Sequence, residues 1–150
     1  MVERDYASLP PVSTDRHKVL QILVNLLHNA RHACAESSSP LRHVAIRIRP
    51  EGDKFVCVEV NDNGVGIPPE NLTRIFAHGF TTRKDGNGFG LHGGALAAAE
   101  LGGSLNAFSD GPGHGATFVL KLPRVHSPGN SKSSSSAHSP VEADTDSTRR

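Results

Sequence analysis

The glycine-rich stretch 86–94 carries the clearest chemical signal. Gly86, Gly88 and Gly90 alternate with other residues, and an alanine-rich segment that predicts a helix to about Leu101 follows. Glycine lets the backbone approach a ligand closely, and the first turn of a helix offers unpaired N–H groups at the positive end of its dipole. Together these features predict an anion site, most often for phosphate. A flexible surface loop has the same composition, so other residues must decide.

Two familiar nucleotide motifs do not explain this stretch. Residues 88–93 fit the pattern G-x-G-x-x-G, but the dinucleotide motif needs an apolar strand before it and an acidic residue about 20 positions later. Residues 81–85 are polar and so do not form the apolar strand that the motif needs. The P-loop pattern and the protein-kinase signatures are also absent.

A second candidate group is Asp62, which ends an apolar strand predicted for 55–61. Gly64 and Gly66 follow it. This arrangement predicts a carboxylate at the edge of the core, where backbone can pass close to a ligand. The alternative is an ordinary turn rich in Asn and Gly, which ends many strands.

A third candidate group lies on a predicted helix at 16–35. Asn25, Asn29 and His32 are spaced i, i+4, i+7 and therefore share one face of that helix. Asparagine is unfavourable inside helices because its amide competes for backbone hydrogen bonds. Two on one face suggest a function, although exposed polar residues or satisfied core amides remain the alternative.

Hydrophobic periodicity predicts the elements that position these groups. The helix at 16–35 has an apolar stripe at i, i+3, i+4 and i+7, with Ser13, Thr14 and Asp15 as candidate N-caps. Residues 1–11 predict an extended or turn-like lead-in. The other predictions are strands at 44–49, 55–61, 104–109 and 116–122, a hairpin at 51–54, a short helix at 70–76, a mobile lid at 77–90, and a helix from 91 to 101 that Gly102 and Gly103 stop.

Composition limits the classes of function. The 150 residues carry a net charge of +1, so bulk electrostatics favour neither nucleic-acid nor membrane binding. No apolar run approaches the roughly 18 residues of a membrane span, and no secretory signal is evident, so a cytoplasmic domain is expected. Cys34 and Cys57 are predicted to be reduced, buried thiols. The nine histidines are scattered, and none is combined with a carboxylate in a zinc-binding pattern such as H-x-x-x-H. A zinc site is therefore not expected.

The composition also divides the chain into two parts. One domain is predicted for 1–124, and the serine-rich segment 125–150 is predicted to be a disordered tail because it has little to bury.

Five segments, taken in order, resemble the boxes of the ATP-binding catalytic domain of bacterial sensor histidine kinases. They are 25–30 (N box), 62–66 (G1 box), 75–82 (F box), 86–91 (G2 box) and 113–118 (glycine–threonine motif). Chaperone, type II topoisomerase and mismatch-repair ATPases share this superfamily. The resemblance implies an α/β (α+β) fold: a two-layer sandwich in which a mixed sheet packs against helices on one face, with a mobile ATP lid.

The resemblance also implies a role for each matching residue. Asn29 would ligate Mg²⁺, with Asn25 as a second candidate, and Asp62 would accept a hydrogen bond from adenine. Thr117 would support Asp62, and Gly64 and Gly66 would give the base room. The residues implied to bind phosphate are Gly86, Gly88, Gly90, Leu91 and His92, with His32 and Lys84 beside them.

The chain differs from the family, or from its hydrolysing relatives, in three features. Family members usually carry Lys or Arg three residues after the magnesium asparagine, where this chain has His32, and Arg31 or Lys84 are candidate substitutes. No His-Glu pair typical of the phosphoacceptor occurs, so the chain looks like an excised catalytic domain. Asn25 replaces the Glu that activates water in the hydrolysing relatives, and Asn cannot take a proton.

The resemblance therefore implies a kinase that uses ATP and Mg²⁺ and transfers the γ-phosphoryl group to a histidine on a separate dimerisation domain, for relay to a response regulator. The full-length protein could be anchored in a membrane that this domain does not contact. Alternatives are an ATPase, an anti-sigma-factor serine kinase, and a nucleotide-gated module that only docks on a partner.

Overall fold

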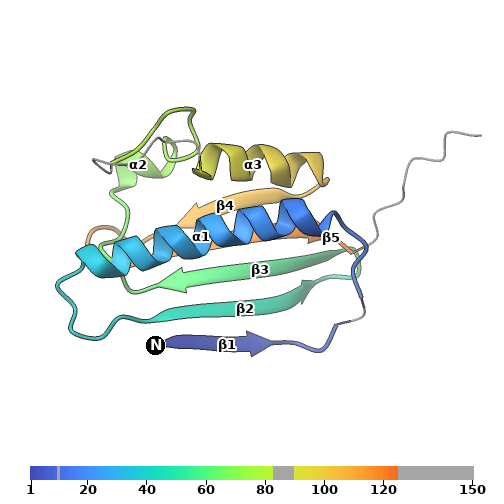
Figure 1. Cartoon of the computed structure of the whole chain (residues 1–150), viewed down its shortest axis with the longest axis horizontal. Helices are drawn as coiled ribbons and strands as arrows, with labels where there is room; N and C mark the ends of the chain where they lie inside the picture. Colours follow the sequence, from blue (N-terminus) through green and yellow to red (C-terminus); the bar gives the residue numbers. More distant parts are fainter. Residues whose placement is uncertain (10, 83–89, 125–150) are drawn as a thin grey trace, which may run out of the picture.

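The computed structural model describes residues 1–9, 11–82 and 90–124. Figure 1 shows a five-stranded sheet with the two longer helices on one face. The strands are β1 (Val2–Tyr6), β2 (Val44–Glu51), β3 (Phe55–Asp62), β4 (Ser104–Phe108) and β5 (Ala116–Pro123), and the helices are α1 (Arg16–Glu36), α2 (Pro69–Leu72) and α3 (Gly90–Glu100).

The sheet is mixed, with strand order β1-β2-β3-β5-β4. β1 runs parallel to β2, and the other neighbouring strands are antiparallel. Alternate residues of β3 and β5 face the helices, and there they form a core with α1 in which Val60, Leu120 and Leu26 are fully buried. The predicted two-layer sandwich is thus confirmed.

β1 corrects the sequence-based prediction of an extended or turn-like lead-in at 1–11. Val2–Tyr6 pairs with β2 along its length, and the Ala7 N–H continues the pairing by donating to the Ile48 carbonyl at 2.9 Å. The strand has no apolar alternation because it lies at the edge of the sheet, where charged residues are common. Asp5 pairs with Arg49 and Glu3 with His43, so charged side chains tie this strand to its surroundings.

α1 begins and packs as its sequence predicts. The Asp15 carboxylate caps the helix by accepting from the backbone N–H groups of His17 and Lys18, at 2.9 and 3.2 Å. Its buried residues follow one another at intervals of four: Ile22, Leu26, Ala30 and Cys34. Asn25 and Asn29 each come three positions after a buried residue, which places them on the flank of this stripe.

The short helix predicted at 70–76 is correct in position but too long. α2 ends at Leu72, and the chain then continues in turns, with the N–H of Ala77 bonded to Arg74 and that of Phe80 to Ala77. On this path Ile75 is buried in the core while Thr73 and Arg74 stay exposed, as they would in a helix.

α3 ends where its glycines predict. Gly102 takes φ +75 and Gly103 donates to the Ala98 carbonyl at 2.9 Å, a common way to close a helix. Among the described residues, no helix is both long and apolar enough to cross a membrane.

Candidate functional site

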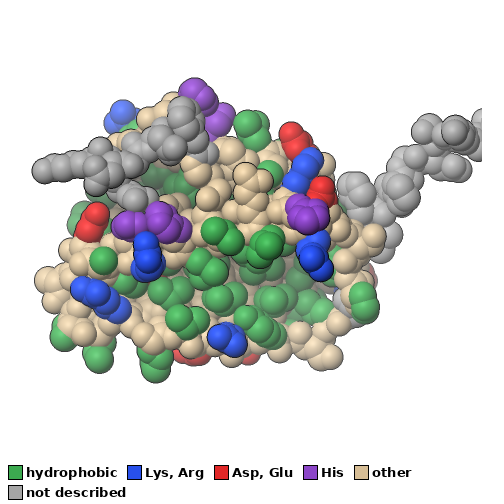
Figure 2. Space-filling view, in the orientation of Figure 1, with side chains coloured by type: hydrophobic (Ala, Val, Ile, Leu, Met, Phe, Trp, Pro, Cys, Tyr) green, Lys and Arg blue, Asp and Glu red, His purple; other side chains and the backbone are tan. Residues whose placement is uncertain are grey.

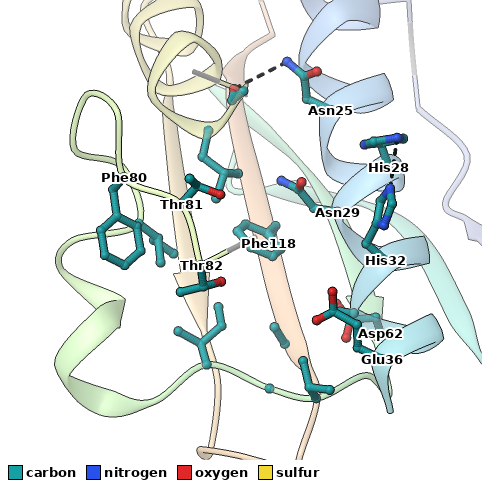
Figure 3. Close-up of a pocket in the computed structure, with 18 residues that line it drawn as sticks. Asn25, His28, Asn29, His32, Glu36, Asp62, Phe80, Thr81, Thr82 and Phe118 are labelled. Carbon is teal, nitrogen blue, oxygen red and sulfur yellow. Dashed lines mark hydrogen bonds between the residues drawn. The ribbon is translucent and has the colours of Figure 1, made fainter. Parts of the chain in front are cut away.

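A cavity of about 350 Å³ lies between α1, the loop after β3 and the start of α3 (Figure 3). Its polar lining comes mainly from α1 and from the end of β3, and its apolar lining from β5 and the turns after α2. The lining residues are Asn25, His28, Asn29, His32, Ala33, Glu36, Asp62, Val65, Gly66, Ile67, Ile75, Phe80, Thr81, Thr82, Gly90, Leu91, Ala116 and Phe118.

Asp62 forms the floor of this cavity. Its side chain is only 3% exposed, and one carboxylate oxygen accepts a hydrogen bond from the Gly64 N–H at 2.9 Å. Burial raises the pKa of Asp62, while backbone hydrogen bonds with Gly64 and Ala116 lower it in part. A buried carboxylate next to a cavity is a strong hydrogen-bond acceptor for a ligand that carries an N–H group.

Neighbouring backbone leaves no room for a side chain at Gly64 or Gly66, the two glycines after Asp62. A Cβ on Gly64 would lie 2.4 Å from the carbonyl carbon of Ala33, and one on Gly66 would lie 2.1 Å from the Gly111 carbonyl oxygen. Hydrogen bonds hold the same loop, from Val65 to the Ala33 carbonyl at 3.1 Å and from Gly113 to the Val65 carbonyl at 2.7 Å. The structure thus gives Gly64 and Gly66 a packing role, and of the two only Gly66 lines the cavity.

Asn29 and Asn25 occupy different positions on the α1 wall. The Asn29 side chain points into the cavity (Figure 3). The Asn25 amide donates to the carbonyl oxygen of Gly90 at 3.4 Å, which connects α1 to the first turn of α3.

An amide oxygen at the position of Asn29 suits Mg²⁺, which prefers oxygen ligands and keeps several waters. Among the described residues, no group of three or more His, Cys, Asp or Glu side chains is arranged to hold a metal. The Asn29 amide oxygen is thus a donor on this wall whose chemistry fits a magnesium ion.

His32 lines the cavity beside His28, which the sequence analysis did not select. The two Nε2 atoms are 3.2 Å apart and the rings meet edge to face, with centroids 4.4 Å apart. The sequence signal for this pair is its H-x-x-x-H spacing. The zinc pattern also needs a carboxylate, and none is grouped with the pair among the described residues.

The remaining predicted residues lie at several places. Gly90 and Leu91 line the cavity. The His92 ring is turned away, with Nδ1 2.9 Å from the carbonyl oxygen of Phe76. Thr117 accepts a hydrogen bond from the Asn61 amide at 2.7 Å and does not line the cavity. Three predicted phosphate-binding residues lie outside the described residues: Lys84, Gly86 and Gly88.

The neighbours of Thr117 take the position beside Asp62. Ala116 pairs with Asp62 across β3 and β5, and Ala116 and Phe118 both line the cavity. Because side chains alternate along a strand, Thr117 faces the other side of the sheet. Sequence alone did not provide this register between two strands that are distant in the chain.

Comparison with known proteins assigns the chain to a family. The family described as "Histidine kinase-, DNA gyrase B-, and HSP90-like ATPase" matches residues 14–126. The chain is 37% identical over 118 residues to the sensor protein CitS of Halalkalibacterium halodurans, covering 77% of this chain and 22% of that protein. It is 31% identical over 127 residues to the sensor histidine kinase ZraS of Salmonella typhimurium, covering 79% and 24%. The chain thus spans about a quarter or less of these curated relatives.

Solved structures agree in fold. The mycobacterial sensor histidine kinase MprB matches with a TM-score of 0.67 and 25% identity, covering 81% of each chain. The catalytic domain of histidine kinase ThkA matches with a TM-score of 0.68 and 26% identity, covering 83% of this chain and 82% of that one. Full-length ShkA, solved in complex with AMPPNP, matches with a TM-score of 0.66 and 27% identity over 81% of this chain and 25% of ShkA. The chain therefore belongs to the histidine kinase-, DNA gyrase B- and HSP90-like ATPase family, as an ATP-binding catalytic domain of the sensor histidine kinase type.

Proposed function

We propose that the cavity binds ATP with its adenine amino group on Asp62. The observation that carries this proposal is the buried Asp62 carboxylate at the floor of the cavity, with one oxygen fixed by the Gly64 N–H. An ionised carboxylate can only accept hydrogen bonds, so it favours a base with an amino group over one with an oxo group at the same position. Val65, Ile67 and Phe118 add apolar lining, which suits a planar base.

The phosphates then extend toward α1 and the first turn of α3. Asn29 provides an amide oxygen on one side, and the backbone N–H groups of Leu91 and His92 lie in the first turn of α3 on the other. A bound Mg²⁺ neutralises phosphate charge. Lys84, Gly86 and Gly88 stay proposed phosphate contacts, since they lie outside the described residues.

The proposed reaction is transfer of the γ-phosphoryl group to a histidine on a separate helical dimerisation domain, followed by relay to a response regulator. The similarity to CitS, ZraS and ShkA supports this reaction over the other activities of the family. Asn25 supports it too, because its amide cannot take a proton from water and is occupied by the Gly90 carbonyl. We also propose a cytoplasmic position for the domain, where ATP is present, and a domain extent of 1–124, which ends just after β5.

Phosphotransfer in a two-component mixture tests this function. The purified chain would be mixed with Mg·ATP labelled on the γ-phosphate and with the purified helical hairpin that carries the acceptor histidine. We expect acid-labile label on the hairpin, and none when its acceptor histidine is replaced by Gln. Steady release of free phosphate with no labelled hairpin would indicate an ATPase instead. Nucleotide binding with neither product would indicate a docking module.

A further inference from the structure

Two histidine rings converge on one face of α1 beside the cavity. His28 and His32 are four residues apart, and Figure 3 shows their side chains next to one another, away from the direction of Asn29. Their Nε2 atoms, 3.2 Å apart, are the atoms through which imidazole commonly binds metals.

The separation of these nitrogens matches a metal chelate. Two Zn–N bonds of about 2.05 Å at a tetrahedral angle place the nitrogens about 3.3 Å apart. The observed spacing of 3.2 Å is close to this chelate distance, and rotation of the two side chains would aim both nitrogens at one ion. An ion between the rings would replace the hydrogen bond between the two ring nitrogens with two metal–nitrogen bonds.

We propose that His28 and His32 form a binding site for a divalent transition-metal ion of the class that prefers imidazole, such as Zn²⁺. This site is separate from the proposed magnesium site, because Mg²⁺ requires oxygen ligands while borderline ions select nitrogen. His28 is exposed, so water completes the coordination. No third His, Cys, Asp or Glu is grouped with the pair in the part of the chain that the structure describes, which makes the site an open one.

The cavity lining favours a cation, although Arg31 neighbours both histidines along α1. The described residues that line the cavity include the carboxylates of Asp62 and Glu36 and no Lys or Arg. An ion on the pair therefore meets no fixed positive charge from the lining, and it adds positive charge at the rim of the cavity. Figure 2 shows histidine side chains at the surface of the face that carries α1, and His28 is exposed, so the ion can enter from solvent.

Zinc titration of the full 150-residue chain tests the site. Nitrogen-15 NMR of the histidine rings would follow each imidazole as Zn²⁺ is added without nucleotide. We expect the first equivalent to shift the His28 and His32 rings together and Mg²⁺ at the same concentration to shift neither. His28→Gln and His32→Gln should each weaken zinc binding at least about tenfold, since the remaining ring loses its intramolecular partner.

His17→Gln is the matched control. His17 is also exposed on α1, but it has no histidine one turn away, so its loss should leave zinc affinity unchanged. Melting temperatures without metal would confirm that each variant folds. Equal zinc affinity in the parent and in the His28→Gln and His32→Gln variants would overturn the proposal. So would a first equivalent that shifts other histidines, such as His78 and His92, instead of this pair.

Discussion

The floor of the cavity and the segment that faces it are built differently, as two glycines show. Gly66, in the loop after Asp62, and Gly79, in the turns after α2, have almost the same backbone angle, with φ +76 and +75. A Cβ on Gly66 would lie 2.1 Å from the Gly111 carbonyl oxygen, whereas a Cβ on Gly79 would meet no atom of the described residues within 4 Å. Packing against neighbouring backbone therefore requires glycine at Gly66, whereas at Gly79 only the backbone angle favours it.

This contrast extends to the residues around each glycine. On the floor, Gly115 approaches the Asp62 backbone so closely that a Cβ would lie 2.0 Å from its carbonyl oxygen. On the facing side, His78, Thr81 and Thr82 are exposed. Backbone contacts therefore fix the group proposed to read the base, whereas these three residues of the facing segment lie outside the core. The mobile lid predicted at 77–90 agrees with this contrast but stays a prediction, because 83–89 lie outside the described residues.

The largest expected effect comes from the glycines themselves. Gly66→Ala should destabilise the fold by at least about 3 kcal/mol, because a methyl group cannot fit against the Gly111 carbonyl and φ is also unfavourable for alanine. Gly79→Ala, the matched control, should cost only the conformational penalty of about 1–2 kcal/mol. Urea unfolding measures both, and equal losses would remove the difference between the two regions.

Next in size is the division of roles between the asparagines of α1. Asn29→Ala should lower Mg-dependent ATP affinity at least about tenfold, or 1.4 kcal/mol, because it removes the proposed metal ligand. Asn25→Ala should have a smaller effect, since it removes only a 3.4 Å contact with the Gly90 carbonyl. Calorimetry with and without Mg²⁺ compares the two. The metal assignment fails if Asn29→Ala binds Mg·ATP as tightly as the parent.

Asp62, on the floor of the cavity, should lower the stability of the folded protein when it is ionised. Because burial raises its pKa in the folded state, the folded protein binds the proton more tightly than the unfolded chain. Stability of the parent should therefore fall as pH rises from the ordinary Asp value, about 4, through the raised one. Asp62→Asn cannot titrate, so its stability relative to the parent should increase over that interval.

Urea unfolding at pH 4 and at pH 7 measures this change. Asp53→Asn, in the exposed β2–β3 turn, controls for the removal of one surface carboxylate. A parent that gains stability over Asp62→Asn between the two pH values would contradict the account.

The smallest expected effect lies in α3. Gly93 is inside the helix, and among the residues that the structure describes no atom lies within 4 Å of an added Cβ. Gly93→Ala should stabilise the protein by about 0.5–1 kcal/mol through helix propensity. Thermal unfolding measures the gain, and a loss of stability would show that the site has less space than the structure indicates.

Local patterns predicted the fold to the extent that each element carries its own signal. The stripe on α1, the hairpin at Gly52 and the stop at Gly102 depend on neighbouring residues, and all three are observed. β1 was missed as a strand because it lies at the edge of the sheet and its charged side chains show no apolar alternation. α2 was predicted too long because the turns after Leu72 bury Ile75 as a longer helix would, so apolar spacing does not distinguish the two.

Site residues could be predicted where residue type and spacing identify them. They could not be predicted where the register between strands determines which residue faces the cavity. Asp62, Asn29 and Gly90 could be selected by type and spacing, and all three border the cavity. Ala116 could not be selected, because only the pairing of β3 with β5 brings it beside Asp62 while Thr117 turns away. The contact of Gly64 with Ala33 likewise joins segments whose proximity no local pattern encodes.

Nucleotide affinity of Asp62→Asn tests most directly the claim that this carboxylate binds adenine. Isothermal titration calorimetry would measure Mg·ATP and Mg·GTP binding to the parent and to the variant, with the fold of each checked by circular dichroism. The account predicts that the variant loses about 1–3 kcal/mol of ATP binding, the usual effect of mismatching a buried polar contact, and that its preference for ATP over GTP narrows. Equal ATP affinity in the two proteins would contradict it.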